Sequence, residues 1–596
     1  MRLQQLEPRW FEDRDIGGCS SFEYGATWVP ACREHIDHWA PWEHCDSKKI
    51  RRCAVVTRSA IPAAMPNTAK IFNDAIFAVN NRDLKRAEEL FRSVIKTDEA
   101  HIGALNLLVV VLMSTERFAE AEPFIARATS LNQQSDVSFY NYGLISKRLR
   151  KPQQAFENFS KAIALNPSIA ETWNNRGTVL NDLKKYDLAI SDFDKAIAIN
   201  GQYSEAYANK GKSLTSLERN DEAFAAYDKA LSLKPNLEGA WLGRGDVLCH
   251  QRRYDDAIAA YDKALSLKPD FAEAWLGQGN ALYRLRCLDE ALAAYDKAIA
   301  QRPDLAEAWL GRGNVFYNSK RHDEAIAAYD RAIALSPDLA EAWHKRGIIK
   351  VIRGNEQEGQ KDCEQAILLG ASKEAIDFNL ARHGAIEKVH TMPRKVVEDL
   401  FDDHANHFDS LLVNELGYVV PSKLFALILR HAEKNTLVDA LDLGCGTGLM
   451  GVQLRPIVKT LVGVDLSRQM LEKAKVRTIY NELACRDIIE FTKSDTRSYD
   501  LVTSTDVFIY VGDLSAVFDS VYRRLNVGGY FAFSVEATDE GNYILTESGR
   551  YRHTKAYLEQ LGHYNGFKIH AIEDCILRKE DQRGMPGFLA VMSRPR

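Results

Sequence analysis

Small and aromatic residues recur every 34 positions between Thr68 and about Lys373. Each complete unit has an aromatic residue at its fourth position, glycine at its eighth and, in most units, alanine at its twentieth. Small residues let two helices approach closely, and proline near the end of a unit stops the second helix. The pattern therefore predicts a stack of antiparallel helix pairs. The aromatic positions are Trp173, Tyr207, Trp241, Trp275, Trp309 and Trp343, the glycines are Gly177, Gly211, Gly245, Gly279, Gly313 and Gly347, and the prolines are Pro235, Pro269, Pro303 and Pro337.

After Lys373 this spacing stops and a different pattern begins. Residues 396–432 have helical character, and short apolar runs then alternate with helix-like segments. The runs cover residues 437–443, 460–467, 498–508, 525–536, 567–573 and 587–594. Alternating strands and helices predict an α/β domain with a mostly parallel, doubly wound sheet and a ligand at the carboxyl ends of its strands.

The first 64 residues lack hydrophobic periodicity. They hold Cys19, Cys32, Cys45 and Cys53, whose spacings of 13, 13 and 8 match no structural zinc pattern. We therefore expect an irregular, poorly ordered extension and no metal site. A start at Met65, directly before the first periodic helix, is an alternative interpretation of this segment.

Composition narrows the class of protein. The net charge of -5 and the pI near 6.3 do not favour a general nucleic-acid binder. No apolar run approaches the ~20 residues that a membrane-spanning helix needs. The ten cysteines lack even spacing, which favours free thiols and a cytoplasmic protein.

The repeat resembles the tetratricopeptide repeat (TPR), with about nine units over residues 65–373. This resemblance implies a helical solenoid whose concave surface takes a protein or peptide partner. Position 6 of three successive units is Asn141, Asn175 and Asn209, and the resemblance directs this position to the inner groove. Carboxamides both donate and accept hydrogen bonds toward an extended main chain. The three asparagines are therefore candidate peptide-groove residues, although asparagine is also tolerated on a solvated helix face.

The stretch DLGCGTGLMG, from Asp442 to Gly451, has two interpretations. Starting at Gly446 it matches the G-x-G-x-x-G fingerprint of dinucleotide-binding proteins. Starting at Asp442 it resembles the D-x-G-x-G-x-G motif of class I methyltransferases that depend on S-adenosylmethionine (SAM). With Gly446 first, the preceding strand would contain Asp442 and Gly444, which is a poor fit. With Gly444 first, the strand is Val438 to Leu443, and Asp442 lies at its end.

Later segments support the methyltransferase interpretation. DLSRQML, from Asp465 to Leu471, and LNVGG, from Leu525 to Gly529, resemble the D-x-S-x-x-M-L and L-x-P-G-G motifs of these enzymes. Val527 stands where that turn usually has proline. The resemblance covers about residues 395–596 and implies a seven-stranded sheet whose last strand runs antiparallel.

The same resemblance implies SAM as cofactor and a set of cofactor-binding residues. Glycines would let the backbone approach the methionine part, Asp442 would favour its ammonium group, and Asp465 would accept hydrogen bonds from the ribose. Asp487 and Ile488 are candidates for adenine contact. The full set is Asp442, Gly444, Cys445, Gly446, Gly448, Asp465, Leu466, Met470, Asp487, Ile488 and Thr505.

A general base is needed only where the methyl acceptor loses a proton. Asp506, Tyr510 and His553 are the candidates, because each follows a predicted strand or lies in a segment that could face the acceptor. Each also has an ordinary structural role open to it: Asp506 in capping a loop, Tyr510 in packing and His553 in starting a helix.

The sequence thus predicts a multidomain enzyme that transfers a methyl group from SAM to an unidentified acceptor, with the repeats recruiting a protein substrate or partner. The expected boundaries are 1–64 for the extension, 65–373 for the repeats, 374–436 for a helical linker and 437–596 for the methyltransferase domain. Two alternatives stay open: a non-catalytic scaffold with a vestigial SAM-binding domain, and an NAD-dependent oxidoreductase.

Overall fold

The computed structural model describes residues 66–596 except 388, 406–407, 410–411, 413–415, 433–436 and 581–582. The expected extension at residues 1–64 lies outside the described residues. The chain forms two compact units, one ending at Gly243 and the other beginning at Arg244. This division falls within helix α12 (Glu238–His250), inside the repeat array. Each unit is described below by itself.

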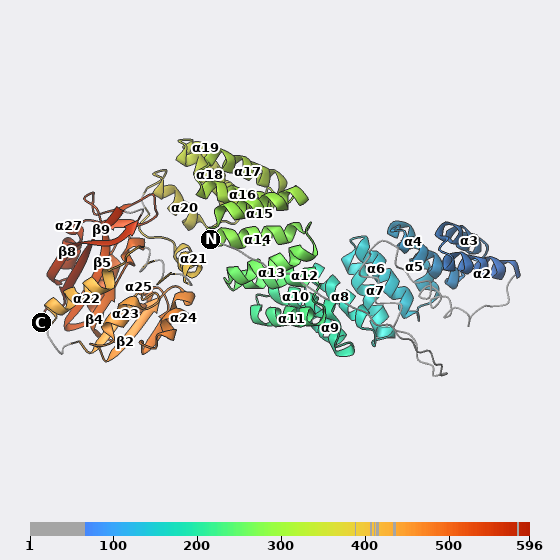
Figure 1. Ribbon diagram of the computed structural model, residues 1–596, viewed down its shortest axis with the longest axis horizontal. Helices are drawn as coiled ribbons and strands as arrows, with labels where there is room; N and C mark the ends of the chain where they lie inside the picture. The colour runs from blue at the N-terminus through green and yellow to red at the C-terminus, as the bar shows by residue number, and fades with distance from the viewer. Residues whose placement is uncertain are drawn as a thin grey trace, which may run out of the picture. The chain divides into compact units, whose positions relative to one another are not determined.

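The repeats form the expected antiparallel helix pairs, drawn in blue to green in Figure 1. In the first unit they are α2 (Pro66–Asn80), α3 (Leu84–Thr97), α4 (Ile102–Ser114), α5 (Phe118–Leu131), α6 (Asp136–Arg148), α7 (Pro152–Leu165), α8 (Ala170–Asp182), α9 (Tyr186–Ile199), α10 (Ser204–Ser216) and α11 (Asn220–Leu233). In the second unit they are α13 (Tyr254–Leu267), α14 (Ala272–Arg284), α15 (Leu288–Gln301), α16 (Ala306–Asn318), α17 (His322–Leu335), α18 (Ala340–Ile352) and α19 (Glu356–Leu368).

Glycines allow the two helices of a repeat to pack closely against each other. A Cβ atom on Gly245 would lie 2.5 Å from the Tyr261 ring, and a Cβ on Gly279 would lie 2.8 Å from the Tyr295 ring. Both rings are almost completely buried. The repeated glycine is therefore required by close contact with an aromatic ring of the same repeat. The sequence pattern predicts the close approach of the two helices but not this ring.

Each turn between the paired helices uses a left-handed residue. The residue two positions before the second helix has a φ between 57° and 64° at eight successive turns, from Arg82 to Lys320, and the next turn uses Gly354 with a φ of 84°. A left-handed residue ends the first helix and reverses the chain. The periodic sequence thus fixes both the helices and the turns that join them.

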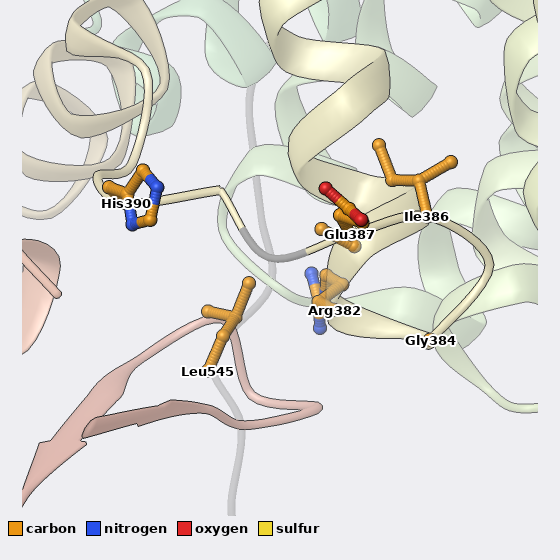
Figure 2. A pocket seen from close by; sticks show the side chains of 7 residues that line it. Arg382, Gly384, Ile386, Glu387, His390 and Leu545 are labelled. Carbon is orange, nitrogen blue, oxygen red and sulfur yellow. The ribbon is translucent and has the colours of Figure 1, made fainter. Parts of the chain in front are cut away.

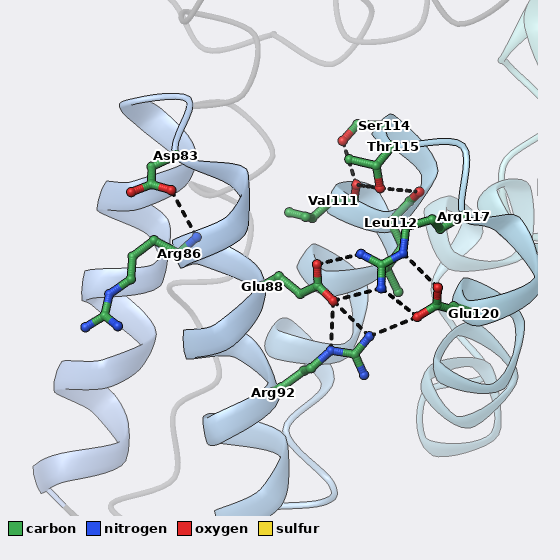
Figure 3. A network of polar contacts seen from close by, with 10 residues as sticks. All are labelled: Asp83, Arg86, Glu88, Arg92, Val111, Leu112, Ser114, Thr115, Arg117 and Glu120. Atoms are coloured by element: carbon green, nitrogen blue, oxygen red, sulfur yellow. Dashed lines mark hydrogen bonds and ion pairs between the residues drawn. The ribbon is translucent and has the colours of Figure 1, made fainter.

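Ion pairs link neighbouring repeats in the first unit (Figure 3). Arg117 Nη1 lies 2.7 Å from Glu88 Oε2, and Arg117 Nη2 lies 2.6 Å from Glu120 Oε2. Arg92 contacts the same two carboxylates at 2.9 and 3.3 Å. The arginines are more than a third exposed, so solvent screens these pairs and each contributes little to stability.

The second unit continues into an α/β part through α20 (Lys373–Arg382), α21 (Arg394–His404) and α22 (Val420–His431). Its other helices are α23 (Leu449–Leu454), α24 (Arg468–Val476), α25 (Ile488–Ser494), η4 (Phe508–Tyr510), α26 (Ser515–Arg524) and α27 (Lys555–Tyr564). Its strands are β1 (Asp439–Leu443), β2 (Thr460–Asp465), β3 (Glu482–Cys485), β4 (Tyr499–Ser504), β5 (Leu525–Ala537), β6 (Tyr543–Leu545), β7 (Tyr551–His553), β8 (Lys568–Glu580) and β9 (Arg583–Ser593).

The sheet has the order β3-β2-β1-β4-β5, with β9 beside β5 and β8 beside β9. The first five strands are parallel, and β9 runs antiparallel to β5, as the sequence predicts for the last strand. Side chains alternate between two apolar layers: Leu441 packs on one face and Ala440 on the other. This doubly wound arrangement brings the carboxyl ends of β1, β2 and β4 to one edge.

A short hairpin adds two strands to the seven that the sequence predicts. β6 and β7 pair antiparallel, and β7 pairs with the last residues of β5, where Arg552 lies opposite Glu536. Strands of three residues give too weak a periodic signal to be recognised in the sequence. Their position is important, because the hairpin lies at the carboxyl end of β5.

Candidate functional site

The glycine-rich loop joins β1 to α23 at the carboxyl edge of the sheet. Gly444, Gly446 and Gly448 all have left-handed φ values, of 67°, 52° and 94°. A Cβ on Gly444 would lie 2.1 Å from Val507 Cγ2, whereas a Cβ on Gly446 would meet nothing closer than Phe408 at 4.0 Å. Gly444 is therefore required by both conformation and close packing, and Gly446 by conformation alone.

Asp442 is completely buried at the end of β1. Its Oδ1 accepts a hydrogen bond from Thr503 Oγ1 at 2.8 Å, and its Oδ2 accepts one from Tyr480 Oη at 2.7 Å. Burial raises the pKa of Asp442 to about 6. The carboxylate thus ties β1 to β4 and to the segment before β3, and both of its oxygens already have protein partners.

Asp465 lies at the end of β2, beside the glycine loop. Its Oδ2 accepts a hydrogen bond from the Gly446 amide at 2.8 Å, and its Oδ1 accepts one from the Ser467 amide at 2.9 Å. Burial raises the pKa of Asp465 to about 6, which the two amide hydrogen bonds partly oppose. The carboxylate therefore holds the loop at the position where two parallel strands end.

Other predicted cofactor-binding residues follow the ends of β1, β2 and β3. Cys445 is buried, and burial raises the pKa of its thiol well above the usual value. Met470 is fully buried in α24, and Leu466 packs against an apolar cluster that includes Met392 and Tyr551. Asp487 caps α25 by accepting from the amides of Ile489 and Glu490 at 2.8 and 2.9 Å. Ile488 is buried in the core, so the structure gives Asp487 and Ile488 clear structural roles.

Segments before the sheet cover the loop. Asp402 of α21 accepts from Ser467 Oγ at 2.5 Å, and Asp409 accepts from Thr447 Oγ1 at 2.5 Å and pairs with Arg477. These contacts bring the covering segment close to the glycine loop and to the start of α24. The residues that make these contacts are far apart in the sequence, so local motifs did not predict the contacts.

A buried charged cluster lies where β4, β5 and β8 meet. Arg578 contacts Asp506 Oδ2 from Nη1 at 2.9 Å and also pairs with Glu536. Glu536 is 1 % exposed and lies 3.4 Å from Arg552 and 3.6 Å from Arg550, both carried by the inserted hairpin. Sequence reasoning singled out Asp506 but missed Glu536 and Arg578, because β8 reaches this edge only through the fold.

Asp506 has three unusual features. It is a non-glycine residue with a φ of 57°, a conformation that L-residues adopt at a cost. Its Oδ1 is buried and has no hydrogen-bond partner among the described residues. Burial raises the pKa of its carboxyl group, which the nearby Arg578 opposes. Strain, an unpartnered oxygen and a perturbed pKa together are typical of a functional position.

Thr505 and Tyr510 lie in the same segment as Asp506. The Thr505 side chain hydrogen-bonds Tyr418, whose pKa is raised well above the usual value by burial. Tyr510 contacts the Phe401 ring edge-on, with centroids 5.3 Å apart, and burial raises its pKa to about 12. Tyr510 therefore stays protonated near neutral pH.

His553 lies against the loop that follows η4. It is completely buried, and its Nε2 contacts the carbonyl oxygens of Val511 and Gly512 at 3.0 Å each. Burial lowers its pKa to about 4. The neutral ring donates from Nε2 to the two loop carbonyls, and its buried Nδ1 has no hydrogen-bond partner among the described residues. The acid–base role of His553 therefore stays a prediction.

Of the three asparagines of the first unit, Asn141 and Asn175 are buried and Asn209 is partly exposed. Asn175 is 1 % exposed and donates to Tyr140 Oη at 3.1 Å, and Asn141 is 8 % exposed. Asn209 donates to Asn174 Oδ1 at 2.9 Å. The amides of Asn175 and Asn209 connect the first helices of neighbouring repeats, which leaves less of each side chain for a peptide.

Among residues that the structure describes, no group of three His, Cys, Asp or Glu side chains is arranged to hold a metal ion. No described helix is both long and apolar enough to cross a membrane.

Comparison with known families gives two kinds of match. Residues 441–533 match a family described as "Methyltransferase domain". Tetratricopeptide repeat families match residues 137–169, residues 170–203 and three overlapping ranges, 209–272, 242–306 and 276–340.

Several curated relatives of this chain are methyltransferases. A malonyl-[acyl-carrier protein] O-methyltransferase of Bacillus anthracis is 28 % identical over 115 residues, which cover 19 % of this chain and 42 % of that protein. The protein of the same name from Legionella pneumophila is 26 % identical over 191 residues, covering 30 % and 62 %. The chain thus spans roughly half of each relative's length.

Two solved structures are similar to portions of the chain. YrrB, a TPR protein with an unusual peptide-binding site, is 26 % identical, with a TM-score of 0.27 and coverage of 32 % of this chain and 97 % of that one. An S-adenosylmethionine-dependent methyltransferase from Clostridium acetobutylicum is 22 % identical, with a TM-score of 0.26 and coverage of 32 % and 98 %.

Proposed function

We propose that this chain, which combines tetratricopeptide repeats with a methyltransferase domain, is an enzyme that transfers a methyl group from SAM. The observation that supports it most is the Asp465 carboxylate at the end of β2, hydrogen-bonded across the loop to the Gly446 amide. A buried carboxylate beside a left-handed glycine loop suits a ligand that carries a ribose and an amino-acid group.

The residues present fit SAM in three respects. A Cβ on Gly446 would meet only the Phe408 side chain, at 4.0 Å, so the backbone here is not closely packed. The Asp465 carboxylate can accept from ribose hydroxyls by giving up its bond to the Gly446 amide. Asp442 acts at a distance, because both of its oxygens are occupied; it fixes β1 and supplies negative charge near the loop.

The cofactor supplies an activated methyl group, and the chain's own residues orient the acceptor. Positioning alone contributes up to ~7–11 kcal/mol to such reactions. Asp506 Oδ1 is the group that we assign to the acceptor, because it is buried, lacks a partner among the described residues and belongs to a strained residue. It accepts a hydrogen bond from the reacting O–H or N–H and takes the proton where one is lost.

Two observations bear on the chemistry of the methyl acceptor. The curated relatives are named malonyl-[acyl-carrier protein] O-methyltransferases, which favours methylation of an oxygen atom. The repeats favour an acceptor that is part of a protein, or one delivered by a protein partner. We propose that the repeat array recruits this protein.

The experiment is methyl transfer from radiolabelled SAM into a cell extract, scored separately for protein and for small molecules. We expect label that depends on the full chain, and loss of about 10²–10⁴ in kcat for Asp506→Asn if this carboxylate takes the proton. Asp519→Asn, which removes an exposed carboxylate of α26, is the matched control.

Absence of label with a chain that binds SAM would favour the non-catalytic scaffold. Label at the wild-type rate with Asp506→Asn would instead show that Asp506 has no part in the transfer.

A further inference from the structure

Helix α21 contacts both a repeat of the second unit and the candidate cofactor site. Nη2 of Arg252, in the turn before α13, lies 3.6 Å from Asp402 Oδ2 and 3.7 Å from Asp399 Oδ1. The side chains of Arg252 and Asp402 are less than a quarter exposed, so solvent screens this pair less than the surface pairs of the first unit. The other oxygen of Asp402 accepts from Ser467 Oγ at 2.5 Å. One carboxylate of α21 thus contacts an arginine of the repeats and the segment that follows β2.

A continuous series of polar contacts leads from Arg252 to the glycine loop. Ser467 is 1 % exposed, and it donates from Oγ to Asp402 and from its amide to Asp465 Oδ1 at 2.9 Å. Asp465 Oδ2 accepts in turn from the Gly446 amide at 2.8 Å. The series therefore ends at the carboxylate that we assign to the ribose of the cofactor.

The positive charge of Arg252 suits the two carboxylates in this series. Asp402 and Asp465 share Ser467 as a hydrogen-bond donor. Burial raises the pKa of Asp465, and the charge of Asp402 raises it further. An ionised carboxylate is the stronger acceptor for ribose hydroxyl groups. A guanidinium group beside Asp402 offsets the repulsion between the two carboxylates and so favours the ionised form of Asp465.

The segment before α21 has a separate attachment to the sheet. It leaves α20 beside a pocket of about 640 Å³, which residues of this segment line together with Leu545 of β6 (Figure 2). Within the segment, His390 Nδ1 contacts Tyr543 Oη of the same hairpin at 2.5 Å. The hairpin therefore holds the chain before α21, whereas Arg252 contacts the helix itself.

We propose that Arg252 is a positioning residue for the SAM site, contributed by the repeats. It fixes the Asp402 carboxylate, and Asp402 fixes Asp465 through Ser467. The inference deepens the proposed function and rests on it. It makes a repeat part of the support of the cofactor site, in addition to the recruiting role of the array.

The turn before α13 accepts side chains of either charge. Arg252 has a φ of 58°, and the equivalent residues of other repeats, with φ values of 57° or 58°, include Glu116, Lys184, Glu218 and Lys320. A glutamate or a lysine at position 252 therefore meets the same backbone requirement. Reversing the charge there changes the contact with α21 without removing a residue that the turn needs.

The test is calorimetry of SAM binding to the full chain. We expect Arg252→Glu to weaken the affinity by about threefold or more, because it places a like charge beside Asp402. Arg252→Lys keeps the charge and should stay within about twofold of the natural chain. Arg286→Glu is the matched control, because Arg286 holds the equivalent turn of the next repeat with a φ of 64°. Circular dichroism and thermal unfolding check that each variant is folded.

A second pair of variants separates this series of contacts from general docking of α21. Asp402→Ala removes the acceptor of Ser467 Oγ and should weaken SAM binding by about threefold or more. Asp399→Ala removes the other carboxylate that pairs with Arg252, and it should change the affinity by less than about twofold.

Any of four results would overturn the inference: a smaller effect of Arg252→Glu, an equal effect of Arg286→Glu, a loss in Arg252→Lys as large as in Arg252→Glu, or equal effects of Asp399→Ala and Asp402→Ala. Failure of the natural chain to bind SAM would instead overturn the proposed function. If the natural chain binds SAM and Asp465→Ala loses it, while Arg252→Glu binds as well as the natural chain, only the role of Arg252 is refuted.

Discussion

Glycine serves different purposes in the repeats and in the loop after β1. Gly277 lies in a regular helix, and it is required because a Cβ there would lie 2.6 Å from the Tyr261 ring. A Cβ on Gly446 would meet only Phe408, at 4.0 Å, and glycine is required there because φ is 52°. In the first case the requirement for glycine comes from a neighbouring side chain, which a mutation can change. In the second case it comes from the glycine's own backbone conformation. Only the second kind marks a site where a ligand can approach the main chain.

The repeats themselves show that the residue at position 6 varies with the ring in the preceding helix. Where the second helix carries Phe159 or Phe193, position 6 of the next repeat is Asn175 or Asn209. Where it carries Tyr261, that position is Gly277, and a Cβ there would also lie 2.9 Å from the phenol oxygen. The phenol donates to Asp246 Oδ1 at 2.8 Å. Glycine stands at position 6 after Tyr227, Tyr261 and Tyr295, and Lys345 stands there after Tyr329. The asparagine series therefore ends at the first tyrosine, but a tyrosine does not exclude a side chain at this position.

The largest effect is expected for Gly444→Ala, because Gly444 combines both requirements. Left-handed strain of ~1–2 kcal/mol and overpacking of ~1–3 kcal/mol against Val507 add to a loss of roughly 2–5 kcal/mol in stability. Scanning calorimetry of the full chain measures it. Gly354→Ala is the control, because Gly354 has a φ of 84° but no atom within 4 Å of a Cβ. Equal losses in both variants would show that contact with Val507 is unimportant.

A smaller loss is expected for Gly277→Asn. Overpacking against Tyr261 costs about 1–3 kcal/mol. Adding Tyr261→Phe reproduces the junction of Phe159 with Asn175, so the double variant should recover part of that loss, although Tyr261→Phe alone costs about 1 kcal/mol through its lost hydrogen bond. Urea unfolding of the single and double variants measures the coupling. Strictly additive losses would contradict the packing explanation.

The most specific effect is the pH dependence at Asp442. Its pKa is raised to about 6 in the folded chain, so its proton is bound more tightly there than in the unfolded chain. The protonated carboxyl group therefore makes its full contribution to the free energy of unfolding below about pH 4. This contribution is lost as the pH rises through about 6. As the pH rises from about 4 to above 6, the natural chain should lose roughly 2–3 kcal/mol of stability that Asp442→Asn keeps.

Unfolding at several pH values, with Asp439→Asn on the same strand as control, measures this difference. A stability difference between Asp442→Asn and the natural chain that stays constant from pH 4 to 8 would refute the raised pKa.

The sequence predicts the helix pairs and most of the sheet because these depend on local periodicity. Glycine and alanine recur at fixed positions of each repeat, so the close approach of its two helices can be inferred from that spacing. The candidate site is different. Arg578 reaches Asp506 from a strand 72 residues later, and Tyr480 reaches Asp442 across 38 residues. Such contacts follow from strand order, which a local pattern does not contain. The roles of the cofactor-binding residues remain predictions.

The proposed cofactor is tested most directly by calorimetry of the full chain with SAM, S-adenosylhomocysteine and NAD, comparing the natural protein with Asp465→Ala. We expect the two sulfur compounds to bind and NAD not to bind. Asp465→Ala should lose this binding while the repeats keep their helical circular dichroism signal. Binding of NAD without SAM, or unchanged SAM affinity in Asp465→Ala, would contradict the assignment of this loop to SAM.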